Sequence, residues 1–155
     1  MAVPSDRMAD ADGSVLLTSA DVQPLLAAAV EHAGGALVSW RLQHVDSQPG
    51  SSTTATYAAR VDWPTGRREE LLGASARVGG RRGNDDRAVV FGDGGREVAV
   101  WLYPDDPDLP GLRRAASVTE LGALLAEHQL IKTPPPRQAI TLEMISYRPR
   151  RRAVL

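Results

Sequence analysis

The spacing of apolar residues predicts a helix near the start of the chain. Five apolar residues follow the i, i+3, i+4, i+7 repeat that places side chains on one helical face: Val22, Leu25, Leu26, Ala29 and Val30. Thr18 or Ser19 can cap the N-terminus of this helix, and the pair Gly34-Gly35 is expected to end it. Residues 1–17 are polar and rich in Gly, Asp and Ser, so we expect a disordered leader there.

After the helix the repeat shortens to two residues, which is typical of β-strands. Threonine, valine and aromatic residues are frequent, and turn residues separate the runs. The turns fall at residues 46–50, 64–66 and 92–95, and an arginine- and glycine-rich loop is expected at 79–86. The pattern predicts a mostly antiparallel sheet with strands at 36–44, 52–63, 69–78, 88–91 and 97–103.

The last third of the chain changes character. Residues 103–112 combine three prolines with three aspartates, which predicts a rigid extended connector. Ser117 and Glu120 form a capping box for a helix that runs to about His128. The prolines at 134–136 predict a stiff spacer, residues 139–147 a strand, and residues 149–151 a turn into a returning strand.

These elements give an α+β fold with two or three helices. The length of 155 residues favours one folded domain. Within it, the predicted organisation is a leader at 1–17, a cap-like α+β domain at 18–132, and a proline-rich spacer with a hairpin at 133–155. The returning strand at the end has only four residues, so we expect its edge to need further strands.

Composition narrows the classes of function. The net charge is −1 and the pI is about 6.3, so no field over the whole surface favours nucleic acid or anionic lipid. No stretch approaches the roughly 18 apolar residues of a membrane span, and the N-terminus lacks a secretory signal. There is no cysteine, which excludes disulfides and thiolate chemistry. We expect a cytoplasmic protein that binds neither nucleic acid nor membrane.

Few residues form a recognisable catalytic pattern. His44-Val45-Asp46 matches the first half of the His-x-Asp loop of phosphotransferases, but Ser51 stands where a magnesium-binding asparagine is required, and the segment fits a turn better. Asp105, Asp106 and Asp108 lack the spacing of a calcium loop, which favours a structural loop. The three histidines have no metal-ligand spacing, and capping or surface roles suit them better.

The strongest candidate site is the predicted turn near the end of the chain. Arg150, Arg151 and Arg152 lie between two predicted strands, and guanidinium groups can bind phosphate oxygens through paired hydrogen bonds. The same arginines also suit a solvated turn, and the residues alone favour that interpretation.

Two segments resemble a known family. Residues 100–112 resemble the W-x-Y/F-P-x-D-P-x-L-P-x-L segment in the N-terminal part of actinobacterial phosphotransferases of the aminoglycoside phosphotransferase and choline kinase-like superfamily. Residues 147–155 resemble the Y-R-P-G-R-R-A-V strand-turn-strand that follows it there, and the order and spacing agree. The resemblance runs from about Val38 to the end and departs from the pattern at Arg150, where the family usually has glycine.

The resemblance implies an ATP-dependent small-molecule kinase. In it, residues 149–152 would occupy the place of the loop that covers the nucleotide in the N-lobe, so Arg150, Arg151 and Arg152 would contact ATP. The lysine, the His-x-Asp base and the magnesium ligands of the family match no position here. The expected partners are therefore a C-terminal kinase lobe and a small-molecule acceptor, with ATP and magnesium as cofactors of the parent enzyme. We expect the chain alone to be inactive and to bind neither cofactor tightly.

A second hypothesis needs no enzyme. The hairpins and the connector can form a stand-alone, non-enzymatic module that binds a partner, with the basic end serving only solubility. The coding sequence after Leu155 distinguishes the hypotheses, since a downstream strand lysine and His-x-Asp favour the kinase, whereas a stop codon favours the module.

Overall fold

A computed structural model describes residues 10–79, 87–92, 95–131 and 140–155. The chain forms two compact units, Met1–Tyr103 and Pro104–Leu155, each described here by itself. The division follows Tyr103, where the prolines of the connector end the last strand of the sheet. The boundaries after residues 17 and 132 stay a prediction.

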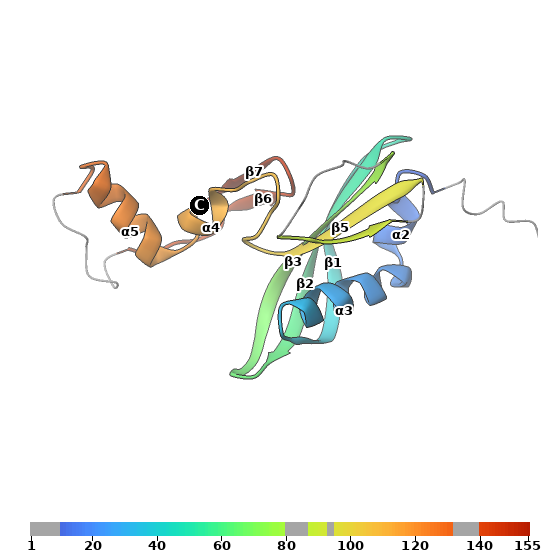
Figure 1. Ribbon diagram of the computed structural model, residues 1–155, viewed down its shortest axis with the longest axis horizontal. Helices are drawn as coiled ribbons and strands as arrows, with labels where there is room; N and C mark the ends of the chain where they lie inside the picture. Colours follow the sequence, from blue (N-terminus) through green and yellow to red (C-terminus); the bar gives the residue numbers. More distant parts are fainter. Residues whose placement is uncertain (1–9, 80–86, 93–94, 132–139) are drawn as a thin grey trace, which may run out of the picture. The chain divides into compact units, whose positions relative to one another are not determined.

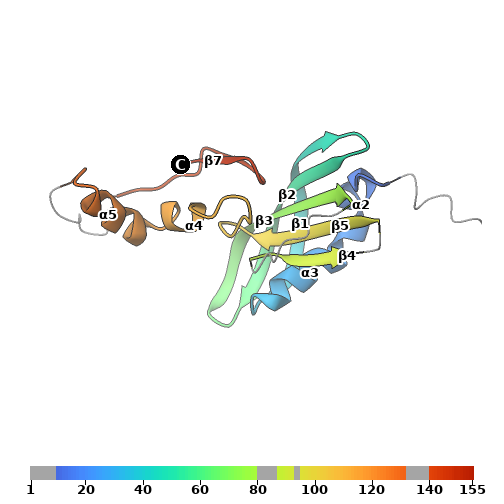
Figure 2. The ribbon, with the colours of Figure 1, turned by 45° about the horizontal axis from the view of Figure 1, so that its top comes forward.

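The first unit is built on a five-stranded antiparallel sheet, which confirms the predicted α+β class (Figure 1). Its strands lie in the order β1-β2-β3-β5-β4, so the short β4 forms one edge beside β5, as Figure 2 shows, and β1 forms the other. The strands are β1 (Ala36–Gln48), β2 (Ser52–Trp63), β3 (Gly66–Val78), β4 (Val89–Gly92) and β5 (Arg96–Leu102).

β1 is longer than we predicted. We predicted a strand at 36–44 and a turn at 46–50, but Asp46 and Ser47 still lie in β1 and pair with β2. The chain reverses only after Gln48, where Pro49 precedes Gly50 with φ 74 and Ser51 N donates to Gln48 O at 2.9 Å. These are the features of a type II turn, which is tight enough for pairing to continue to the ends of both strands.

Short helices precede the sheet: α2 (Ser14–Thr18), the 3-10 turn η1 (Ala20–Val22) and α3 (Gln23–His32). Ser19 caps this region by accepting from Asp21 N, and Gly34, with φ 93, ends α3 as expected. The leader prediction was wrong for its last residues. Residues 14–17 are helical, and Leu17 is fully buried because its side chain enters the core.

One face of the sheet and these helices enclose the core. Figure 1 shows α3 lying across the sheet, with α2 closer to β2 and β3. The buried tyrosine Tyr57 donates from its hydroxyl to Leu17 O at 2.6 Å and meets Trp40 edge-on, with ring centroids 5.7 Å apart. Burial raises the pKa of Tyr57 well above its usual value. The core also contains Val22, Leu26, Ala29, Val30, Ala55, Ala59, Val61, Leu72, Ala74, Ala76, Val98 and Val100.

Gly73 marks a close approach within the sheet. A Cβ atom at this position would lie 2.5 Å from the indole nitrogen of Trp101, which is on the neighbouring β5. Trp101 itself is 1% exposed. Only glycine leaves room for this ring.

The second unit contains α4 (Leu112–Ala115), α5 (Val118–Glu127) and a hairpin of β6 (Ser146–Arg148) and β7 (Arg152–Val154). Ser117 caps α5 as predicted by accepting from Glu120 N at 3.3 Å. Gln129, with φ 58, ends that helix, as Leu130 N donates to Leu125 O and Gln129 N donates to Ala126 O.

The strand predicted at 139–147 is mostly absent from the described residues. Only Ser146–Arg148 form a strand, and Ile145 N adds one bond to Val154 O, because β7 offers just three residues for pairing. Alternating apolar and polar residues predict an extended segment, but a strand also needs a partner strand to pair with. Ala139, the proline spacer at 134–136, most of the 79–86 loop and residues 93–94 of the β4–β5 turn lie outside the described residues.

Within the described ranges, none of the helices has the length and apolar character needed to cross a membrane.

Candidate functional site

The arginine-rich turn predicted from the sequence is a three-residue connection between β6 and β7. Arg151 N donates to Arg148 O at 3.1 Å, Pro149 occupies the second position of the turn, and Arg150 the third. Arg150 has φ 61, a conformation that costs a non-glycine residue about 1–2 kcal/mol. Proline followed by a residue with positive φ indicates a type II turn. The position at which the resembling family has glycine therefore has the backbone conformation that glycine favours.

The side chain of Arg150 does not belong to an exposed arginine cluster. Its Nη1 lies 3.1 Å from Asp108 Oδ1, and the side chain is only 7% exposed. We predicted Arg150 as a phosphate ligand because it follows Pro149 in the turn. The structure instead directs its guanidinium to a carboxylate of the connector, so it is poorly placed to bind an external anion.

Arg148 and Arg152 form the more suitable pair. They lie directly opposite each other in the β6–β7 ladder, and both are exposed. Opposed residues of an antiparallel pair project from the same face, and like charges placed this way destabilise the hairpin. An anion lying across the two guanidinium groups would relieve that repulsion. Arg151, also predicted as a ligand, is exposed at the end of the turn.

Arg148 was missed because the prediction relied on residues that are consecutive in the turn. The partner of Arg152 depends on the register of the hairpin, and a three-residue connection pairs it with Arg148. Once the length of the turn is known, counting residues outward from it along both strands identifies this pair. We define the arginine pair as Arg148 and Arg152.

A buried carboxylate of the connector, that of Asp106, binds the hairpin. Asp106 is 0% exposed, and its Oδ2 accepts from Tyr147 Oη at 2.6 Å and from Arg150 N at 2.8 Å. Its Oδ1 accepts from Asp108 N at 2.9 Å. Asp106 and Asp108 thus both contact the hairpin, since Asp108 also pairs with Arg150. No group of three potential ligands in the described part of the chain could hold a metal ion.

A mainly apolar pocket of about 440 Å³ lies beside the hairpin in the same unit. Ala153 lies on the ladder face opposite to that of Arg152, next to it in β7. The pocket is lined by Asp108, Leu109, Pro110, Gly111, Leu112, Ala115, Ala153 and Leu155.

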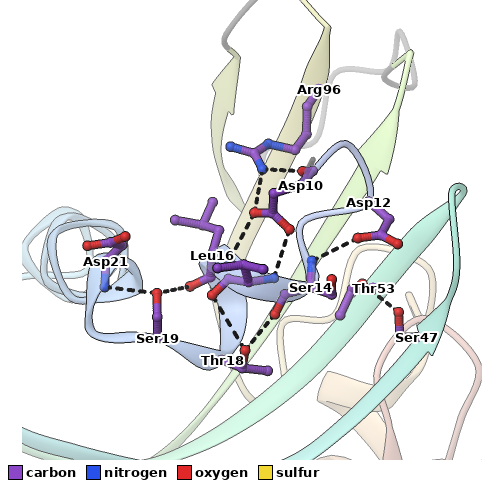
Figure 3. Close-up of polar contacts among 11 residues, drawn as sticks. Asp10, Asp12, Ser14, Leu16, Thr18, Ser19, Asp21, Ser47, Thr53 and Arg96 are labelled. Carbon is purple, nitrogen blue, oxygen red and sulfur yellow. Dashed lines mark hydrogen bonds and ion pairs between the residues drawn. The ribbon is translucent and has the colours of Figure 1, made fainter. Parts of the chain in front are cut away.

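A second polar cluster lies in the sheet unit and fastens its N-terminal segment (Figure 3). The Asp10 carboxylate accepts from Val15 N at 2.7 Å and Leu16 N at 2.9 Å, and it pairs with Arg96 Nη1 at 3.0 Å. All these partners belong to the protein's own backbone and sheet, so the cluster explains how α2 is held rather than how a ligand binds.

Asp12 continues this attachment. Its Oδ2 accepts from Gly50 N at 2.9 Å and its Oδ1 from Ser14 N at 3.1 Å. The bond from the Gly50 backbone, followed by that from Ser14, lowers the pKa of Asp12 below its usual value.

The histidines show no shared site. His32 is in the last turn of α3, His128 is the C-cap of α5, and His44 is in β1. The first two positions agree with the capping role expected from the sequence.

Comparison of the chain with protein-family models, curated proteins and solved structures finds no match.

Proposed function

We propose that this chain is the N-terminal segment of an ATP-dependent small-molecule phosphotransferase similar to the aminoglycoside phosphotransferases, and that it is inactive alone. One observation carries the proposal: the two segments that resemble the family contact each other through the residues that define their motifs. Asp106, the D of P-x-D-P, binds Tyr147 and the backbone of Arg150, which are the Y and the G position of Y-R-P-G.

This contact gives the shared motifs a physical reason to occur together. A carboxylate that accepts two hydrogen bonds from a hairpin 41 and 44 residues away fixes the hairpin against the connector. The positive φ of Arg150 adds to this argument, because the family pattern has glycine at that position.

The arginine pair is the part of the chain that fits ATP. Two guanidinium groups side by side suit the oxygens of a polyphosphate, and such contacts do not require a preformed cavity. When bound, ATP would supply the phosphoryl group for transfer. The acceptor, the C-terminal kinase lobe and the cytoplasmic location belong to the same proposal.

The proposal is tested by titrating the full chain with ATP and with inorganic triphosphate in a calorimeter. We expect weak binding that falls as salt is raised, since the contacts are between exposed charges. Replacing both Arg148 and Arg152 with alanine should lower the affinity about tenfold or more. Arg114→Ala, an exposed arginine of α4 in the same unit, is the matched control and should bind as the wild type does.

A non-enzymatic binding module is the second candidate, and the outer strand of the sheet favours it. β1 forms a sheet edge of 13 residues, with Val38, Leu42 and Val45 between 36% and 44% exposed. An apolar edge strand is a common site for partner binding. Equal affinity of the wild type and the double arginine variant for triphosphate would favour this candidate over the phosphotransferase.

A further inference from the structure

Asp106 is fully buried, and three hydrogen-bond donors surround its carboxylate. Two donors come from the hairpin and meet at Oδ2, while the third comes from the connector itself and meets Oδ1. We call Asp106 with these three donors the Asp106 latch.

The arrangement requires a carboxylate rather than an amide. An asparagine side chain has one accepting oxygen and one NH₂ group, so at least one of the two backbone N–H donors would face another donor. A buried backbone N–H without an acceptor is strongly disfavoured. The latch therefore depends on the two accepting oxygens of aspartate and not only on the size of its side chain.

The latch acts on the one residue of the turn that has an unfavourable backbone conformation. Arg150 has φ 61, and its N–H is directed to Asp106 Oδ2 while its guanidinium pairs with Asp108. Two contacts with the connector thus offset the cost that a side chain adds at a position with positive φ. The type II turn in turn fixes the register that places Arg148 opposite Arg152.

We propose that Asp106 is a positioning residue: by holding Arg150 in its positive-φ conformation, it keeps the arginine pair aligned on one face for a polyphosphate. The identity of the anion rests on the proposed function, whereas the control of the turn by Asp106 does not. Asp106 itself does not touch the ligand.

Glycine at position 150 provides a specific test, because glycine adopts positive φ without assistance. In the full chain, Asp106→Ala should lower the affinity for inorganic triphosphate about tenfold, because alanine offers no acceptor to Arg150 N. Adding Arg150→Gly to that variant should restore most of the lost affinity, and Arg150→Gly alone should bind as the wild type does. Tyr147→Phe is the matched control, since it removes one bond to Oδ2 but leaves the bond from Arg150 N; its effect should be smaller than that of Asp106→Ala.

Amide hydrogen exchange at residue 150 reports the latch independently of any ligand. We expect Asp106→Ala to accelerate this exchange about 10- to 100-fold, and Tyr147→Phe to change it less. If Asp106→Ala weakens binding but Arg150→Gly does not restore it, the positioning role is wrong.

The two proposals fail in different ways. If the wild type binds neither ATP nor inorganic triphosphate, the proposed function is wrong, and the exchange of the Arg150 amide then decides the latch. Unchanged exchange in Asp106→Ala overturns the latch whether or not the wild type binds an anion. Should Asp106→Ala fail to fold, Arg150→Val serves instead, because a β-branched residue opposes positive φ; wild-type affinity and turn geometry in that variant would also overturn the inference.

Discussion

The two units of this chain differ in the interactions that stabilise each of them internally. The sheet unit encloses a core of fully buried apolar side chains between its helices and one sheet face. Among the described residues of the second unit, the large buried apolar side chains are Leu112 and Tyr147, and the acidic Asp106 is buried beside Tyr147. Apolar burial is non-directional and tolerates small shifts, whereas a carboxylate with three donors fixes positions closely. The sheet unit is therefore organised for stability, and the second unit for the geometry of one turn.

The largest effect is expected from a cavity in the sheet core. Leu72→Ala removes a side chain that is 0% exposed and should lower the free energy of unfolding by about 3 kcal/mol. Urea unfolding followed by tryptophan fluorescence measures it, since Trp40, Trp63 and Trp101 all belong to the sheet unit. Val15→Ala, at a side chain of the same unit that is 59% exposed, is the control and should change stability by less than about 0.5 kcal/mol. Similar losses in both would refute the picture of an apolar core.

The next effect concerns the polar unit. Asp106→Ala leaves three donors without their acceptor and should destabilise the hairpin by about 2 kcal/mol, although it deletes no apolar contact surface of note. Amide exchange within residues 145–154 measures this loss. Unchanged protection there would mean that packing, rather than the carboxylate, holds the hairpin.

A smaller effect is expected from the polar contact inside the apolar core. Tyr57→Phe keeps the ring against Trp40 but removes the hydroxyl that donates to Leu17 O, so the loss should be about 1 kcal/mol. The same urea experiment applies. A loss as large as that of Leu72→Ala would show that this unit also depends on directional polar contacts.

The smallest expected effect is a dependence of stability on pH. It arises at Asp12, which attaches the N-terminal segment to the sheet unit through hydrogen bonds from Gly50 N and Ser14 N. The pKa of Asp12 is lowered in the folded state, so its contribution is present above the usual carboxylate pKa and is lost as the pH falls through the lowered value. The difference in stability between the wild type and Asp12→Asn should therefore shrink between pH 7 and strongly acidic pH. A difference that stays constant with pH would exclude the charge of Asp12 as its cause.

Features encoded by neighbouring residues could be predicted from the sequence. The apolar repeat of α3, its Gly34 end, the Ser117 cap and the hairpin of β2 and β3 depend on residues within a few positions of one another. The predicted strand at 139–147 was mostly wrong because a strand also needs a partner, and β7 is short.

The candidate site was only partly predictable for the same reason. Proline and arginine indicated a turn that could face an anion, and the turn is present. The acceptor for Arg150 N is 44 residues away in the chain, so no local pattern reveals that Arg150 is bound to the connector. The choice of Arg148 instead follows from the register, which is known only once the turn conformation is known.

The close contact between Gly73 and Trp101 has a consequence for how this protein can vary over evolution. Glycine cannot gain a side chain while the indole stays, and loss of the indole would leave a void in a buried region. Mutations at the two positions should thus be tolerated together more readily than singly. In any set of divergent descendants, a bulkier residue at position 73 is expected to accompany a smaller one at position 101.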